Sequence, residues 1–228
     1  MLNKYLKKNI PAAKRLVAEL GKTYEYVSIL GSHVLNKRIV VGTANTSVNE
    51  LESECGFVIK VYKDGRYSEY SCDSIADLKA ADVLKAVRLK DVCSSEFRVA
   101  MLEEKEHTED FLREDPDRLS NREIIRRLTE IKDAMHKEAK VINTNCVYAK
   151  RETSKIFVSA RKCLTQKYDW MNAMLMVVTR DGDNIKSNYH AEGEASSLKV
   201  LDMLKKNSAG VLDIAVRLLD AEPIKPGK

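Results

Sequence analysis

Hydrophobic and polar positions repeat along this chain at one constant offset. Residues 24–65 and 141–182 carry the same strand pattern 117 residues apart. In both stretches an apolar run ends in an Asp-Gly dipeptide, at positions 64–65 and 181–182. This dipeptide is typical of tight hairpin turns, because glycine adopts positive φ without steric cost. The pattern predicts a duplicated, strand-rich unit with a hairpin beside a long strand in each copy.

A helix is predicted before the first strand region. Pro11 suits the first turn of a helix and Gly21 suits its end, so Ala12–Leu20 is expected to be a short helix. A further helical turn is expected around Leu2–Lys8.

Helices are also predicted after the first hairpin and around the second repeat. Ser74 and Ser120, each followed three residues later by an acid, have the spacing of a capping box. The first would open a helix reaching about Lys90, and the second would open a helix before the second repeat. A helix or helix pair is expected over 197–219, with a candidate break at 207–210.

These elements predict an α+β fold of internally duplicated antiparallel-sheet units with flanking helices. Alternating strands must bury their apolar side, and the helices are the available cover. The expected boundaries are a first repeat over 1–92, an acidic and partly helical connection over 93–119, a second repeat over 120–221, and a tail over 222–228. In the connection, Phe97, Met101 and Leu102 would pack on one helical side.

Composition adds limits on the class of protein. The 228 residues are 44% hydrophobic, which is enough for one large domain or two small ones without disulfides. The five cysteines form no CxxC pair, and their odd number argues against a disulfide framework. No segment has the length of a membrane span or the pattern of a signal peptide. We therefore expect a soluble, cytoplasmic protein in a reducing compartment.

The net charge of +5 is unevenly distributed. The first eighteen residues carry only basic charges, whereas Glu103 to Asp117 holds eight acids against two bases. A nucleic-acid site would pair such bases with aromatic residues, and only Tyr5 accompanies them. Solvated helix faces are the favoured interpretation, and nucleic-acid binding is the weaker alternative. The basic residues are Lys4, Lys7, Lys8, Lys14 and Arg15.

Two segments carry a family resemblance. Residues 55–66, Cys-Gly-Phe-Val-Ile-Lys-Val-Tyr-Lys-Asp-Gly-Arg, resemble the turn segment of the N-terminal region of TldD/PmbA proteins. Residues 218–228 are similar to the stretch that leads from that region to the metal-binding half of the family. The segment Tyr67-Ser68-Glu69 departs from the family pattern, in which glycine and small residues are common.

The resemblance implies a part of a zinc metallopeptidase system, in which a metal-bearing TldD-type subunit pairs with a PmbA-type (TldE) subunit. Its zinc motif, His-Glu-x-x-x-His, is not in this sequence. Zinc is therefore expected only in a C-terminal half outside this chain, and no cofactor is expected within the chain. The implied partners are that half, a TldD- or PmbA-type subunit, and extended peptides. The sequence does not distinguish the two subunit types.

The individual candidate residues favour structural roles, so we predict no catalytic and no metal-binding residue. His190 with Glu192 and Glu194 could form a ligand cluster, but alternation favours a strand edge. His107, among acids, is expected to be exposed. For Trp170, the only tryptophan, core packing is favoured over a binding role.

The cysteines and glycines give no sign of catalysis either. Cys55 and Cys163 lack a neighbouring histidine and are expected to be small buried hydrophobes. Phosphate loops and the GxSxG elbow are absent from the sequence.

We therefore predict a non-catalytic region of a TldD/PmbA-like metallopeptidase, involved in proteolysis or maturation of peptides. It would provide substrate enclosure and subunit contacts, with extended peptides adding to a sheet edge. The alternative is a stand-alone binding or scaffold module without peptidase activity.

Overall fold

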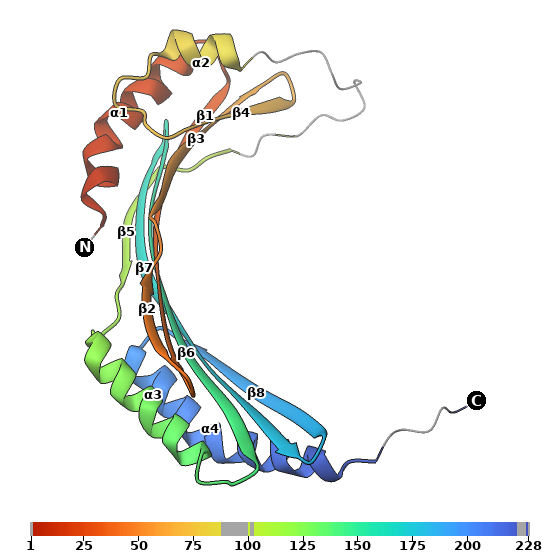
Figure 1. The fold of residues 1–228 in the computed structure, drawn as a ribbon. Coiled ribbons are helices and arrows are strands. Elements are labelled where there is room, and N and C mark those ends of the chain that lie inside the picture. Colours follow the sequence, from red (N-terminus) through yellow and green to blue (C-terminus); the bar gives the residue numbers. More distant parts are fainter. Residues whose placement is uncertain (1, 88–99, 101–102, 223–226, 228) are drawn as a thin grey trace. The chain divides into compact units, whose positions relative to one another are not determined.

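The structure is a computed structural model that describes residues 2–87, 100, 103–222 and 227 (Figure 1). Helices and strands alternate in two similar series. In chain order they are α1 (Lys4–Leu20), β1 (Tyr26–Gly42), β2 (Thr46–Glu50), β3 (Glu54–Lys63), β4 (Arg66–Cys72), α2 (Ala80–Ala86), β5 (His107–Arg113), α3 (Asn121–Met135), β6 (Val141–Ser159), β7 (Lys162–Asp181), β8 (Asn184–Glu194), α4 (Ser197–Arg217) and the 3-10 turn η1 (Leu218–Asp220).

The two series confirm the α+β, internally duplicated fold. Helix α3 begins 117 residues after α1, and α4 begins 117 residues after α2. Strands pair in the order β4-β3-β1-β6-β7-β5, with β2 added to β1 and β8 added to β7. The second repeat keeps one continuous strand, β7, where the first repeat has the separate strands β2 and β3.

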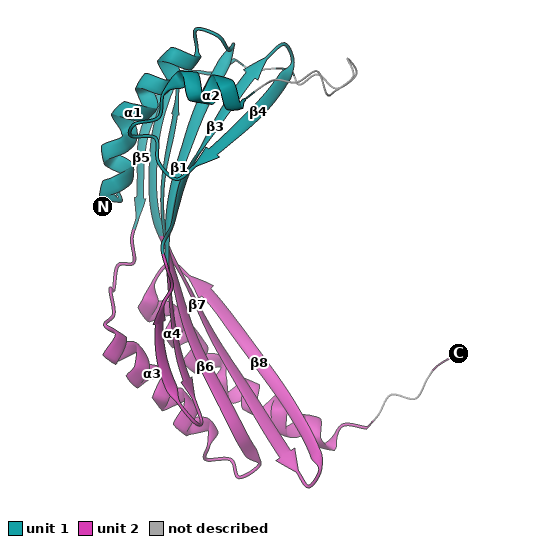
Figure 2. Cartoon of the chain, turned by 45° about the horizontal axis from the view of Figure 1, so that its top comes forward, with its two compact units in different colours: residues 1–35, 53–113, 152–168 teal, residues 36–52, 114–151, 169–228 magenta. Residues whose placement is uncertain are grey.

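The chain divides into two compact units that cut across the sequence repeats (Figure 2). Unit 1 contains residues 1–35, 53–113 and 152–168, and unit 2 contains residues 36–52, 114–151 and 169–228. Each unit therefore takes segments from both repeats, because β1, β6 and β7 each contribute one segment to each unit.

Unit 1 has a core between α1, α2 and one side of its strands. Alternate residues of β1 and β3 point into this core, as expected for strands with one buried face. The buried residues include Leu6, Leu16, Leu20, Val27, Ile29, Phe57, Ile59, Val61, Ile75, Val83 and Ile156.

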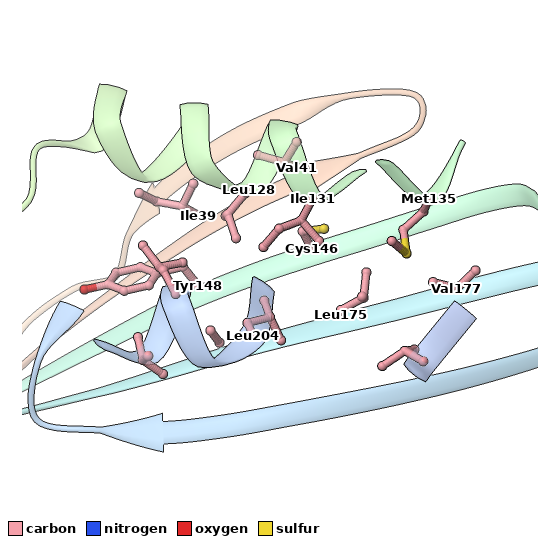
Figure 3. Close-up of a cluster of buried hydrophobic side chains, with 14 of the residues drawn as sticks. Ile39, Val41, Leu128, Ile131, Met135, Cys146, Tyr148, Leu175, Val177 and Leu204 are labelled. Carbon is pink, nitrogen blue, oxygen red and sulfur yellow. The ribbon is translucent and has the colours of Figure 1, made fainter. Parts of the chain in front are cut away.

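Unit 2 has a separate core between α3, α4 and its own strand segments (Figure 3). The apolar stripe of α3 is buried there, as are alternate residues of β7. The residues that meet include Ile39, Val41, Ile124, Leu128, Ile131, Met135, Cys146, Tyr148, Leu175, Val177 and Leu204.

Buried carboxylates hold the loop before α3 against the start of α4. The Asp115 Oδ1 atom accepts hydrogen bonds from the backbone N–H groups of Asp117, at 3.2 Å, and Ser197, at 3.0 Å. The Asp115 N–H donates to Asp169, whose carboxylate also pairs with the Lys150 ammonium at 3.1 Å. This loop thus satisfies backbone donors that the first turn of a helix leaves free.

Both hairpins have the predicted tight turn, but the second is displaced by one residue. Asp64 and Gly65 have φ of 53° and 77°, and they form the two-residue turn between β3 and β4. In the second hairpin, Asp181 pairs with Asn184, so the turn is Gly182-Asp183, with φ of 57° at Gly182. Positive φ at both turn residues is typical of type I′, and at the first alone of type II′.

Two helix predictions were wrong in their limits. Helix α1 starts at Lys4, capped by the Asn3 side chain, and Pro11 lies inside it rather than in its first turn. Helix α2 starts at Ala80 after the uncapped Lys79, because the Ser74 hydroxyl instead accepts a local hydrogen bond from the Ala76 N–H. The predicted end of α2 near Lys90 lies outside the described residues.

Helix α4 runs without interruption from Ser197 to Arg217, so the break expected at 207–210 is absent. The Ser120 cap of α3 is confirmed, since its hydroxyl accepts a hydrogen bond from the Glu123 N–H at 3.2 Å. Packing of one helical face against the core explains why Asn207 and Gly210, which have low helix propensity, do not end α4.

The acidic connection contains a strand. Strand β5 pairs in parallel with residues 162–168 of β7, and all seven of its residues are exposed. The residues expected to pack on a helical side, Phe97, Met101 and Leu102, lie outside the described residues. Among the helices that the structure describes, none is long and apolar enough to cross a membrane.

Candidate functional site

The sheet of unit 2 has one face covered by helices and one open face. In β7, Met171, Ala173, Leu175 and Val177 point into the core with α3 and α4. Thr179 lies on the same side of β7, and its hydroxyl donates to the Ala215 carbonyl of α4 at 2.8 Å. Because strand side chains alternate, the residues between them point to the opposite face.

We call this opposite side the open face, and define it by ten residues of β7 and β8. They form cross-strand pairs, including Met174 with Ala191 and Met176 with Tyr189. The Tyr189 side chain is 70% exposed, and both methionines are half-buried. The ten residues are Trp170, Asn172, Met174, Met176, Val178, Ile185, Ser187, Tyr189, Ala191 and Gly193.

Trp170 lies on the open face, so the favoured interpretation of core packing was wrong. Its side chain is 44% exposed, and its indole N–H donates to Asn172 Oδ1 at 3.2 Å. A Cβ at Gly193 would lie only 3.2 Å from the indole ring, so the glycine provides the space for Trp170 to lie across the neighbouring strand. Asn172 and Gly193 therefore fix the tryptophan in an exposed position.

The open face combines large apolar side chains with few fixed polar groups. Methionine is flexible and polarisable, and adapts to ligands of different shape. Tryptophan and tyrosine offer rigid contact area and a polar end. Chemically, this arrangement is suited to contact with varied apolar side chains.

The strands of unit 1 also have a side that faces away from its core, and this side carries more polar side chains than the open face of unit 2. Tyr26 pairs with Tyr62, and Tyr62 with Tyr67, so three tyrosines form one row across β1, β3 and β4, in which Tyr62 is buried and Tyr67 is exposed. In the next row, the Lys60 ammonium lies 2.9 Å from the Glu69 carboxylate and 4.8 Å from the centre of the Tyr67 ring.

Beyond these rows, a depression of about 280 Å³ lies on unit 1, lined by Leu30, Val58, Ser71 and their neighbours. The Tyr26 hydroxyl donates to Glu104 at 3.3 Å, and burial raises its pKa. Unit 1 thus presents a more polar surface than unit 2.

The histidines are placed apart from one another. His190 lies on β8, as predicted, where its ring bonds Glu192 at 2.6 Å and lies 3.3 Å from Asn207 of α4. His107 is exposed, as predicted, and bonds Glu109. His136 follows α3 and bonds Thr43. Among the described residues, no three His, Cys, Asp or Glu side chains are grouped so that they could hold a metal ion.

Cys55 and Cys163 are half-buried rather than fully buried, and Cys163 packs against the core of unit 1. Among the cysteines that the structure describes, Cys146 is the buried one, and burial raises the pKa of its thiol to about 12. The basic residues of the first eighteen positions lie on the exposed side of α1, as the solvated-face interpretation expected.

One signal for the open face is visible in the sequence. In Met174-Leu175-Met176-Val177-Val178 both alternating sets of residues are apolar. One set faces the core, so the other places apolar side chains on the opposite side of the sheet. The position of Trp170 over Gly193 had no such signal, because it depends on the register between β7 and β8.

Comparison with solved structures gives matches over nearly the whole chain. A protein described as a candidate modulator of DNA gyrase from Bacteroides thetaiotaomicron matches with a TM-score of 0.74 and 17% identity, over 96% of this chain and 52% of its own. A similarly described protein from Thermotoga maritima matches with a TM-score of 0.72 and 16% identity, over 95% and 50%. TldE from Thermococcus kodakarensis matches with a TM-score of 0.60 and 16% identity, over 92% and 47%.

Sequence comparison adds nothing to these matches: no family model matches the chain, and a search of curated proteins finds no match. The chain spans about half the length of the solved proteins it resembles. It therefore has the fold of about half of a TldE-type chain, which confirms the resemblance to TldD/PmbA proteins at the level of the fold.

Proposed function

We propose that this chain is a non-catalytic region of a TldD/PmbA-type metallopeptidase, and that it contributes peptide contacts and subunit contacts. The observation that carries the proposal is the match in fold to solved proteins that include TldE, over 92 to 96% of this chain. The zinc chemistry is assigned to a subunit or half that carries the His-Glu-x-x-x-His motif.

The open face of unit 2 supports a role in peptide contact. An extended peptide exposes side chains on both of its sides, and a sheet face with Trp170, Met174, Met176 and Tyr189 offers apolar contact along its length. Adaptable methionine surfaces bind partners of varied sequence. Such a surface suits an enzyme that accepts different unfolded segments.

Trp170 makes this role directly testable, because it is the only tryptophan in the chain. Addition of a permanently unfolded polypeptide without tryptophan, such as a reduced and carboxymethylated protein, should shift Trp170 emission to shorter wavelength. Met176→Lys places a charge in the centre of the open face and should abolish the shift. Leu112→Lys, at an exposed position of β5, is the matched control and should leave the shift intact.

The assignment to a peptidase has its own test. The chain purified without a histidine tag should hold no stoichiometric zinc and show no chelator-sensitive peptidase activity. Together with a TldD-type subunit that carries the zinc motif, it should support activity. Zinc near one equivalent, lost together with activity, would contradict the proposal. Peptide binding without any effect on such a subunit would instead favour the stand-alone binding module.

A further inference from the structure

Strand β8 leaves one complete edge of the unit 2 sheet unpaired among the described residues. It is eleven residues long, contains no proline, and pairs with β7 on one side only. Natural edge strands are normally short, or protected by proline, bulges or several charges. Its three charged residues, Lys186, Glu192 and Glu194, carry both signs, and Ile185 and Tyr189 are 54% and 70% exposed on it. This edge therefore has the properties of a pairing surface.

The hairpin determines which backbone groups face outward. Asp181 and Asn184 close a two-residue turn, so they form a hydrogen-bonded pair, and such pairs recur at every second residue. The even-numbered residues of β8 thus bond β7. The odd-numbered ones, from Ile185 to Gly193, direct their N–H and C=O groups to the free edge.

The sequence of β8 is complementary to itself in one antiparallel register. When two copies pair about Tyr189, all five outward-facing residues meet an outward-facing residue of the other copy. In the same register Lys186 lies opposite Glu192 of the second copy, twice per pair of strands. Lys186 has no ion-pair partner among the residues that the structure describes, whereas Glu192 also bonds His190 and Asn207 of its own chain. Opposite charges at directly facing positions stabilise a strand pair, and like charges destabilise it.

Helix α4 presents an apolar stripe beside the same edge. Asn207 donates to Glu192 of β8 at 2.6 Å, which identifies the side of α4 that adjoins the strand. Met203, Gly210 and Ile214 occur at helical spacing on this side, and Met203 and Ile214 are exposed. A Cβ at Gly210 would meet nothing within its own chain. A glycine inside a helix costs about 1 kcal/mol relative to alanine, so close approach of a second helix is a physical reason for it.

We propose that two copies of this chain associate through antiparallel pairing of their β8 strands about Tyr189, with their α4 stripes in contact. The symmetry is two-fold, so the same surface serves both copies. This inference goes beyond the proposed function, because pairing uses the backbone N–H and C=O groups along the β8 edge, whereas the proposed peptide contacts use side chains of the open face.

Charge reversal tests the register. Lys186→Glu and Glu192→Lys each place like charges opposite one another at two positions, and each should raise the dimer dissociation constant about tenfold or more. An equimolar mixture of the two variants restores both opposite-charge pairs, and so should the double variant K186E/E192K with itself. Light scattering over a concentration series measures all four samples, and circular dichroism confirms their folding.

A second pair of variants tests the strand edge itself. Ser187→Pro removes an outward N–H without removing a bond to β7, and should give a monomer. Ser187→Ala keeps that N–H and should remain dimeric.

Three results would overturn the proposal: a monomeric native chain at every concentration, a dimeric Ser187→Pro variant, or a mixture of charge variants that stays monomeric. If Ser187→Pro instead abolishes only the Trp170 response to unfolded polypeptide, the edge binds peptide rather than a second copy.

Discussion

The helical covers of the two units differ although each consists of the two helices of one sequence repeat. In unit 2, α3 and α4 have 15 and 21 residues, and serine caps both helices. In unit 1, α1 has 17 residues but α2 has only 7, and its N-terminal Lys79 makes no capping bond. Duplication has thus kept the strand order and the helix starting points, while the length and the capping of the second helix differ.

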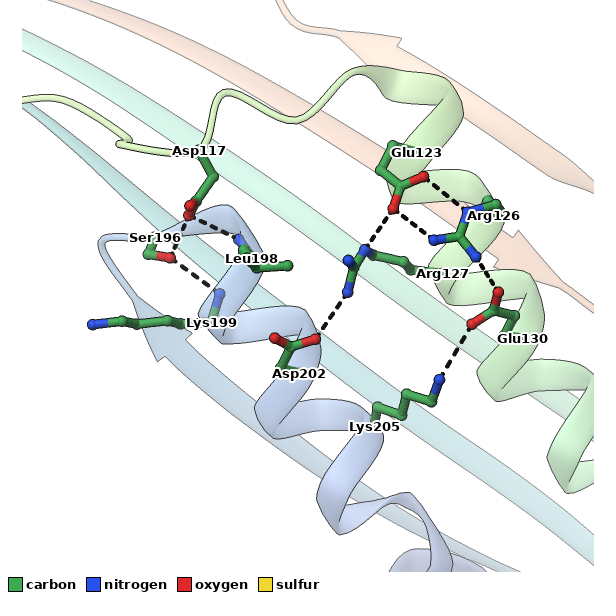
Figure 4. A network of polar contacts seen from close by, with 10 residues as sticks. All are labelled: Asp117, Glu123, Arg126, Arg127, Glu130, Ser196, Leu198, Lys199, Asp202 and Lys205. Carbon is green, nitrogen blue, oxygen red and sulfur yellow. Dashed lines mark hydrogen bonds and ion pairs between the residues drawn. The ribbon is translucent and has the colours of Figure 1, made fainter.

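Contacts between the helices add to this difference (Figure 4). Arg127 bonds Glu123 within α3 and Asp202 on α4, at 2.8 Å in each case. Glu130 of α3 pairs with Lys205 of α4. Asp117 accepts hydrogen bonds from the Ser196 hydroxyl and the Leu198 N–H at the start of α4. Helix α4 is therefore stabilised by the loop and helix before it, whereas α2 depends mainly on its buried face.

The largest effects are expected from cavities in the two cores. Leu128→Ala in α3 and Leu16→Ala in α1 each remove a side chain that is fully buried. Each should lower the free energy of unfolding by about 2 to 5 kcal/mol, because the transfer energy is lost and a cavity remains. Urea unfolding measures both variants. A loss below about 1 kcal/mol in either would mean that this core is looser than its burial indicates.

Removal of the α4 cap should have a smaller effect. Asp117→Ala eliminates the acceptor for two hydrogen bonds at the start of α4, and should cost about 1 to 2 kcal/mol. The control is Asp213→Ala, at an exposed position of the same helix, which should change stability by only a few tenths of a kcal/mol. Equal effects of the two variants would contradict the role assigned to the loop.

Addition of a cap to α2 tests whether the missing capping bond of this helix lowers the stability of the chain. Lys79 already has extended backbone angles, with φ of −95° and ψ of 143°, which suit a capping residue. Lys79→Ser should therefore stabilise the chain by about 0.5 to 1 kcal/mol, whereas Lys79→Ala should not. Thermal unfolding of the two variants and the native chain measures the difference in stability. No gain from serine would indicate that the start of α2 is already satisfied in another way.

The ion-pair network of unit 2 should respond weakly to acid and salt. Hydrogen bonds from Arg126 and Arg127 lower the pKa of Glu123 from 4.5 to about 2. A carboxyl with a lowered folded pKa contributes stability above its unfolded pKa, and the contribution is lost as pH falls from about 4.5 towards 2. The stability difference between the native chain and Glu123→Gln should narrow over this range, and also with added salt. A difference that does not change with pH would exclude an electrostatic role.

Much of the fold was predictable because it depends on local signals. The apolar runs before each Asp-Gly dipeptide gave the hairpins, and Ser120 with Glu123 gave the start of α3. The sequence-based predictions failed where the local structure depends on contacts with distant parts of the chain. Gly210 remains helical because α4 packs on a core built from other elements, and Pro11 is tolerated inside α1 for the same reason. Strand β5 pairs with residues more than fifty positions away, so its short polar sequence gave no indication of it.

The open face was only partly predictable. Two apolar sets in β7 were visible in the sequence, but which set would be covered depends on where α3 and α4 pack. Trp170 was assigned to the core because large aromatic residues are usually buried. Its exposure depends on Gly193, which lies in another strand and has no side chain to fill the space.

The division of each sequence repeat between both compact units has a consequence for synthesis on the ribosome. A tandem duplication usually allows the first copy to fold while the second is being made. Here unit 1 needs residues 152–168 to complete its sheet, so neither unit can finish folding until about three quarters of the chain has emerged. Until then the apolar strands of the first repeat remain without their central neighbour and can pair with other nascent chains. This protein should therefore depend on chaperones that shield early segments, and should be sensitive to truncation after the first repeat.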